Sequence, residues 1–138
     1  FWRGKTFQTE KYAQATSYQT VDDENICWLI TPPVKYESGK ILNFKSAKAY
    51  WVHNGFSVHI STNFDGANVA AATWNQINAT LAGESNNDHE WIPSGSINIS
   101  EYVPQGFNGN FYIAFKYTGS KTNTTTYRVD DIIIEPVK

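Results

Sequence analysis

The 138 residues are enough for one domain with a sizeable hydrophobic core. Apolar residues make up 41% of the chain and charged residues 17%, a balance that excludes an intrinsically disordered chain. The formal net charge of −2 and the lack of a long basic run argue against a nucleic-acid partner. No stretch reaches the roughly 18 apolar residues of a membrane-spanning helix, so we expect a chain that does not itself span a membrane.

The first 25 residues are polar and aromatic and predict one or two short strands. Residues 26–31 form a strongly apolar strand that Pro32 and Pro33 end, because proline cannot donate to a sheet. Cys27 lies in this run. As the only cysteine it cannot form an internal disulfide, and we expect it to be a small buried core residue.

The clearest strand pattern covers residues 56–61. Phe56, Val58 and Ile60 alternate with polar residues, which is the period of a strand with one buried face. Residues 63–66 then have the composition of a turn. This stretch therefore predicts a core strand that runs into a loop at one end of the fold.

Further strands are expected at 41–48, 97–99, 111–117 and 126–135, while residues 69–77 hold either one helical turn or a loop that leads into a short strand. Seven to nine short strands with turn signals between them predict an all-β fold, an antiparallel β-sandwich. No repeat or second domain is visible, so residues 1–138 form one domain. The chain opens without methionine, and we expect it to be cut from a longer surface protein.

No motif in the chain predicts catalysis. The three histidines, His53, His59 and His89, lack the spacing of a zinc site, and we expect them to be structural or exposed. No serine lies in a nucleophile elbow, and no phosphate-binding loop is present. The carboxylates gather in short groups typical of solvated loops rather than of a glycosidase pair. We therefore expect no enzymatic activity.

Aromatic residues outside the alternating core pattern are candidate ligand contacts. They are Trp51, Phe64, Trp74 and Trp91, with Asp65 directly after Phe64. Planar side chains beside Asn, Asp and Gln suit stacking on sugar rings, while polar groups bind hydroxyls. They equally suit capping the ends of a sandwich core, which is the commoner fate of a tryptophan.

Asp130 and Asp131 directly precede Ile132, Ile133 and Ile134, which we expect on a core strand. A buried carboxylate is costly without a partner. These aspartates therefore lie at a strand end in water, pair with a basic or backbone donor, or bind a cation such as calcium, which prefers hard oxygen ligands.

Seven stretches in chain order carry a family resemblance: WLITPP at 28–33, LNF at 42–44, VHISTNFDG at 58–66, TWNQI at 73–77, SGSINISEY at 94–102, FYIAFKY at 111–117 and YRVDDI at 127–132. Together they resemble the cleaved-adhesin and choice-of-anchor J domains of bacterial surface proteins.

The resemblance implies a jelly-roll sandwich of the galactose-binding-like type. It also implies an extracellular or bacterial cell-surface location and a non-catalytic role in adhesion to carbohydrate or to a surface or matrix protein. We expect the isolated domain to be monomeric. The alternatives are a structural spacer without a specific ligand and, less favoured, a glycan-active enzyme. Some relatives hold a structural Ca²⁺ through the aspartate of the last strand. Asp130 has that position here, with Asp131 as the fallback.

Overall fold

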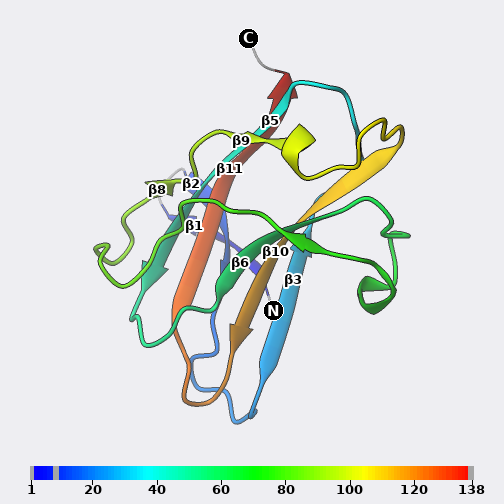
Figure 1. Ribbon diagram of the computed structural model, residues 1–138. Helices are drawn as coiled ribbons and strands as arrows, with labels where there is room; N and C mark the ends of the chain where they lie inside the picture. Colours follow the sequence, from blue (N-terminus) through cyan, green and yellow to red (C-terminus); the bar gives the residue numbers. More distant parts are fainter. Residues whose placement is uncertain (1, 8–9, 137–138) are drawn as a thin grey trace.

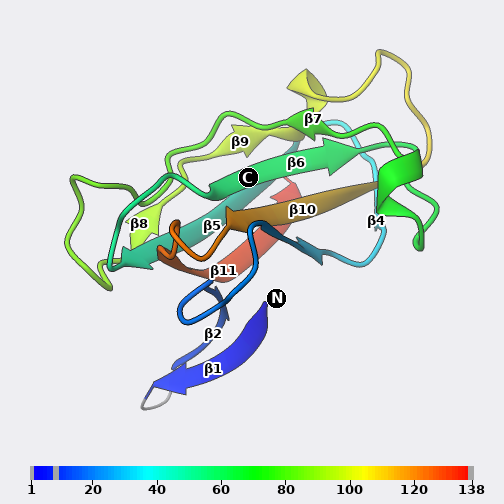
Figure 2. The same cartoon turned by 90° about the horizontal axis from the view of Figure 1, so that it is seen from below.

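The computed structural model describes residues 2–7 and 10–136, whose strands form two antiparallel sheets packed face to face (Figures 1 and 2). The first sheet has six strands: β1 (Arg3–Phe7), β2 (Glu10–Ala15), β11 (Thr126–Pro136), β5 (Lys40–Ala49) and β8 (Ile92–Pro93) in that order, with β9 (Ile97–Asn98) also paired to β5. The second has five: β3 (Asn25–Ile30), β10 (Asn110–Gly119), β6 (Phe56–Ser61) and β7 (Asn75–Gln76), with β4 (Val34–Lys35) paired to β10. The predicted all-β sandwich is confirmed.

The core lies between the sheets because both supply alternating apolar side chains. Phe44 of β5 and Phe115 of β10 meet edge to face across it, with ring centroids 5.1 Å apart. The same core contains further fully buried apolar side chains from the long strands, among them Leu42, Val58, Ile60, Phe111, Ile113, Tyr117, Tyr127 and Val129. In β6 and β10 the alternate side chains consequently face outward.

The longer strands lie within a residue or two of their predicted positions, and the first 25 residues supply β1 and β2. The number of strands exceeds the predicted seven to nine because the structure also contains β4 and β8, which have two residues each and are too short to show a sequence pattern. Residues 69–77 hold both predicted forms, a 3-10 turn at Val69–Ala71 and then β7. A second 3-10 turn covers Ile99–Glu101. Within the described residues, no helix has the length and apolar character needed to cross a membrane.

Two core predictions are wrong. Ile132 and Ile133 are 37% and 47% exposed, because the pairing of β11 with β5 shifts register between Asp130 and Ile133 and turns these side chains out of the core. Cys27 is half-buried rather than buried, although it packs against the core from β3. β3 is an edge strand of its sheet, which leaves one side of it open.

Candidate functional site

The five side chains predicted to touch a ligand lie in three separate places. Phe64, Asp65 and Trp74 belong to the segment around β6 and β7, and the Phe64 and Trp74 ring centroids are 5.4 Å apart. Trp91 precedes β8 of the first sheet. Trp51 follows β5, and its Nε1 donates to Asn54 Oδ1 at 3.0 Å. The structure therefore joins only the Phe64–Trp74 pair into one surface.

Strand register builds rows of side chains on the outer face of the second sheet. Trp28 of β3 pairs with Lys116 of β10, which pairs in turn with Ser57 of β6. The next row on this face contains Ala114 and His59, because side chains two residues apart along a strand share a face. Strands far apart in the sequence thus bring an indole, an ammonium group, an imidazole and a hydroxyl together.

Four aromatic rings follow one another across this face: Trp28, Trp74, Phe64 and Tyr112, which we call the aromatic stripe. The successive centroid distances are 5.4, 5.4 and 4.8 Å. Lys116 Nζ lies 5.1 Å from the Trp28 ring centroid. All four rings are half-buried, so neighbouring rings fix their orientation while part of each ring stays accessible.

The loop that carries Phe64 and Trp74 is held by its own polar contacts. Trp74 Nε1 donates to the Val69 carbonyl at 3.1 Å. Asp65 Oδ1 accepts hydrogen bonds from the Ala67 and Asn68 amides, both at 2.8 Å. These two hydrogen bonds hold the pKa of the Asp65 carboxyl below its ordinary value, and the one from the Asn68 amide has the larger effect. The exposed Asp65 therefore organises the loop that presents the aromatic stripe.

His59 lies beside the stripe, with its ring centroid 5.6 Å from that of Trp28. Its Nε2 is 2.8 Å from Ser57 Oγ. Burial, followed by the positive charge of Lys116, lowers the pKa of His59 below its ordinary value of 6.5. His59 is consequently neutral at pH 7, and a neutral imidazole both donates and accepts a hydrogen bond.

Trp91 lies in a cation–aromatic cluster of the first sheet. Its ring centroid is 5.8 Å from that of Tyr12. Lys45 Nζ lies 4.9 Å from the Trp91 centroid, and the Arg128 guanidinium lies 4.6 Å from the Tyr12 centroid. Both rings are half-buried, and each has a cation over it.

The aspartates proposed as calcium ligands lie at the register shift of β11. Asp131 Oδ2 is 2.9 Å from Lys45 Nζ, and Lys45 is also the strand partner of Asp130. A lysine ammonium thus supplies the positive charge here. Within residues 2–7 and 10–136, no three His, Cys, Asp or Glu side chains lie where they could hold a metal ion. Calcium also accepts backbone and amide carbonyl oxygens as ligands, so the calcium hypothesis stays a prediction for a chelation experiment.

Sequence reasoning did not identify Trp28, Tyr112 or Lys116 as parts of the site. Trp28 stands in the continuous apolar run of β3, which conceals which face is outward. Tyr112 and Lys116 alternate with the buried residues of β10, and this period of two marks their face as outward. The signal that could have found Trp28 is the pairing of β3 with β10, which sequence alone does not give.

Fold and site together define an all-β sandwich domain with an aromatic outer face. The chain belongs to the DUF5017 family, a domain of unknown function, whose model matches residues 34–137. Among solved structures, the chain is similar to one described as "CBM4 structure and function", at 14% sequence identity and a TM-score of 0.36, over 92% of this chain and 74% of that chain. No curated protein matches the chain. The sequence resemblance to cleaved-adhesin and choice-of-anchor J domains is confirmed only as far as the β-sandwich.

Proposed function

We propose that this domain is a non-catalytic binding module that holds carbohydrate against the aromatic stripe. The observation that carries the proposal is the unbroken line Trp28–Trp74–Phe64–Tyr112 on an outer sheet face. Successive rings meet at interplanar angles of 36°, 48° and 83°, so the stripe is stepped rather than flat, and its accessible ring parts suit the C–H faces of sugar units.

Polar groups beside the stripe suit the hydroxyls of a sugar. Ser57 and His59 lie on the outer face of β6, and Gln76 of β7 is the strand partner of His59. Lys116 adds ammonium donors next to the Trp28 ring. A mixed surface of this kind gives affinity through ring contact and selectivity through hydrogen bonds.

The spacer alternative predicts that every tryptophan is buried. All five tryptophans instead keep part of their surface exposed, which favours a binding role over a spacer role. Half-buried tryptophans on a sheet face also suit a protein ligand, and this second kind of partner is distinguished by the experiment below.

The enzyme alternative needs two carboxylates that converge in a cleft or a serine–histidine pair, and Ser57 Oγ lies 2.8 Å from His59 Nε2. In a serine hydrolase, a carboxylate orients the histidine and amide donors stabilise the oxyanion. Within the described residues, His59 has its polar contact with Ser57 and its ring contact with Trp28, and no carboxylate bonds to it. A serine and a histidine two residues apart on one strand face meet by strand geometry alone, so we assign the pair to binding.

The test is a glycan array followed by titration of the bound glycan with variants. Trp28→Ala and Trp74→Ala should each weaken binding at least about tenfold, the loss expected of one stacking ring. Trp51→Ala is the matched control, because Trp51 lies outside the stripe in the loop after β5, and it should leave the affinity unchanged. Melting curves show whether each variant is folded.

Two results would overturn the proposal: no glycan bound by the folded wild-type domain, or an equal loss of affinity in Trp51→Ala. Capture of a matrix protein whose binding depends on Trp28 and survives deglycosylation would move the stripe to a protein-binding role. The location at the outside of a bacterial cell is part of the same proposal and is tested by protease accessibility on intact cells.

A further inference from the structure

A hollow of about 750 Å³ lies on the outer face of the first sheet, among residues separate from the aromatic stripe. Its floor comes from β2 and β11 and its walls from four loops. The residues that matter are Gln14, Thr126 and Arg128 on the floor and Tyr18, Tyr50 and His89 in the walls. We call this hollow the tyrosine pocket.

The walls of the tyrosine pocket are aromatic and unusually exposed. Tyr18 and Tyr50 are 71% and 72% exposed, and Val52 beside them is 51% exposed. The Tyr50 and His89 ring centroids are 6.3 Å apart in an edge-to-face arrangement. Large rings left in water around a hollow are the usual lining of a ligand site.

The backbone of these walls is strained. Tyr50 and His89 have φ angles of +54° and +65°, and Gln19, next to Tyr18, has +62°. They are three of the four non-glycine residues with positive φ in the described chain. The left-handed region is costly for residues with a Cβ atom, and such strain gathers where a side chain has to be held in one place.

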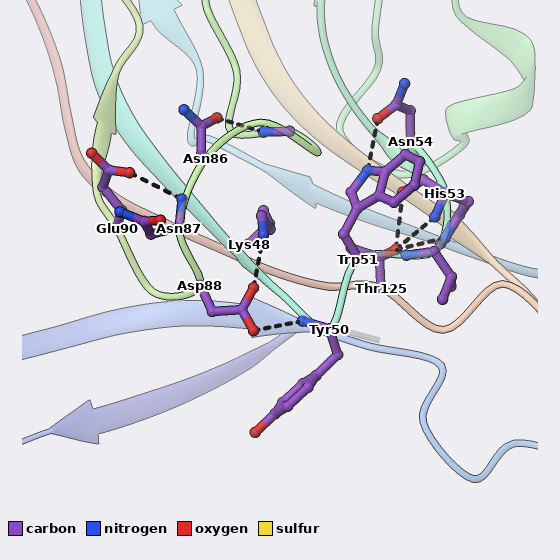
Figure 3. A network of polar contacts seen from close by, with 12 residues as sticks. Lys48, Tyr50, Trp51, His53, Asn54, Asn86, Asn87, Asp88, Glu90 and Thr125 are labelled. Atoms are coloured by element: carbon purple, nitrogen blue, oxygen red, sulfur yellow. Dashed lines mark hydrogen bonds and ion pairs between the residues drawn. The ribbon is translucent and has the colours of Figure 1, made fainter.

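Polar contacts hold the backbones of Tyr50 and His89 in these conformations, and Figure 3 shows those of Tyr50. Asp88 accepts from Lys48 Nζ at 2.7 Å and from the Tyr50 amide at 3.3 Å. The His89 amide donates to the Lys48 carbonyl at 2.8 Å. Figure 3 shows the Tyr50 ring directed away from this network. The ring is thus fixed at its base and presented to solvent.

The floor is polar and positively charged. Arg128 Nε donates to Gln14 Oε1 at 3.0 Å, which fixes the guanidinium and leaves its Nη groups as donors. Thr126 Oγ1 donates to Thr16 Oγ1 at 3.0 Å. Among the described residues that line the pocket, Arg128 alone has a permanent charge, and none of them is an aspartate or a glutamate.

A second hollow adjoins the tyrosine pocket and is also lined by basic side chains. The two share Gln14, Thr16 and Tyr18 as lining residues. The second hollow adds Arg3 and Lys5, with Asp22 as its one acidic residue. Lys5 thus places a second basic side chain next to the pocket that contains Arg128, in a chain with a net charge of −2. This surface is therefore suited to an anion.

We propose that the tyrosine pocket is a second ligand site and that it takes a sugar residue bearing a carboxylate. The carboxylate pairs with the Arg128 Nη groups, whose planar geometry matches two carboxylate oxygens. The sugar ring lies against the exposed Tyr50 ring, and the side chains of Gln14, Thr16 and Thr126 face the hydroxyls. None of these residues belongs to the aromatic stripe, so this inference does not rest on the proposed function.

The test is a titration of the whole domain with glucuronic, galacturonic and N-acetylneuraminic acids, followed by amide NMR, with glucose as the uncharged match of glucuronic acid. At least one acid should bind about tenfold or more tightly than glucose, as one charge-assisted hydrogen bond provides. The perturbed amides should include those of Gln14, Thr16 and Thr126. Affinity for the acid should fall as salt is raised.

Variants localise the site. Tyr50→Ala and Arg128→Gln should each weaken binding of the acid at least about tenfold, and Arg128→Lys should weaken it less because it keeps the charge. Trp74→Ala should leave it unchanged. Arg128 also contacts Gln14 and Tyr12, so its substitution removes structural contacts as well. A melting curve shows whether each variant is folded, and Tyr50→Ala tests the pocket at an exposed side chain that leaves these contacts in place. Equal binding of glucose and the acids, no binding of any acid, or a loss in Trp74→Ala equal to that in Tyr50→Ala would each overturn the inference.

Discussion

Lys48 Nζ donates to Asp88 Oδ1 at 2.7 Å, although only 7% of the lysine side chain is exposed. Lys48 is the strand partner of Tyr127, whose side chain is in the core, so Lys48 shares the inward face of the first sheet. Its ammonium group reaches the rim of the sandwich, where the loop containing Asp88 closes over it. The ion pair thus joins the end of β5 to the loop that carries His89.

We expect Asp88→Ala to lower the melting temperature by several degrees, because it removes the partner of an ammonium group that is largely shielded from water. The double variant Lys48→Met/Asp88→Ala should recover much of the loss, since it replaces the unpaired charge with an apolar side chain. Thermal denaturation of the four proteins in this cycle measures the coupling. A double variant no more stable than Asp88→Ala would contradict the assignment.

Gly55 is a second point where the loop after β5 tolerates little change. A Cβ atom there would collide with the His53 imidazole and the Thr118 carbonyl oxygen. We expect Gly55→Ala to lower the free energy of unfolding by about 2–3 kcal/mol, the scale of overpacking. The control is Gly83→Ala, because a Cβ at Gly83 meets nothing within 4 Å. Chemical denaturation measures both, and equal stability of the two variants would show that the loop relaxes freely.

The sequence predicts the sandwich well because its alternation is strong where one sheet face is buried. Phe56, Val58 and Ile60 fill the core as the pattern indicates. The pattern fails at Ile132 and Ile133, where three consecutive isoleucines give no period and a register shift turns the side chains outward. A bulge of this kind depends on the partner strand, which the local sequence does not contain.

The candidate sites are predicted less well than the fold because each joins distant segments. Phe64 and Trp74 share the loop between β6 and β7, and the sequence identifies them as candidates because they are aromatic residues outside the alternating core pattern. Trp28 joins them only through strand pairing with β10, about 88 residues further along the chain. The tyrosine pocket likewise depends on Tyr50 and Arg128, which meet only when β5 and β11 pair.

His59 gives the domain a pH dependence with a definite sign. Its pKa is lowered from 6.5 in the fold by burial and then by Lys116, so the unfolded chain binds this proton more readily than the folded chain. The stability that neutral His59 provides is complete above pH 6.5 and falls as the pH drops below it.

The expected result is a steeper loss of stability between pH 7 and pH 5 in the wild type than in His59→Gln, measured by denaturant unfolding at each pH. His53 and His89 are present in both proteins, so the difference isolates His59. Asp65 and Asp88 also have lowered pKa values, but their contribution is lost only below about pH 3.8. Parallel pH profiles of the two proteins would contradict the assignment.

The Lys45–Asp131 ion pair leads to a prediction about metal removal. With lysine at 2.9 Å from Asp131, we expect dialysis against a chelator to leave the melting temperature unchanged, because the fold draws its local positive charge from Lys45. A ligand that binds only the folded state has to raise its stability. A fall in melting temperature that added calcium reverses, and that Asp130→Asn abolishes, would restore the calcium hypothesis.

Substitutions at Asp131 separate its charge from its backbone role. Asp131→Asn should cost at most about 1 kcal/mol, since the carboxylate is 60% exposed and surface ion pairs contribute little. Asp131 has a φ of +53°, a region that asparagine and glycine adopt readily and β-branched residues do not. Asp131→Val should therefore cost about 1–2 kcal/mol more than Asp131→Gly. Denaturant unfolding of the three variants decides between the two roles, because a loss that depends only on the charge would be the same in valine and glycine.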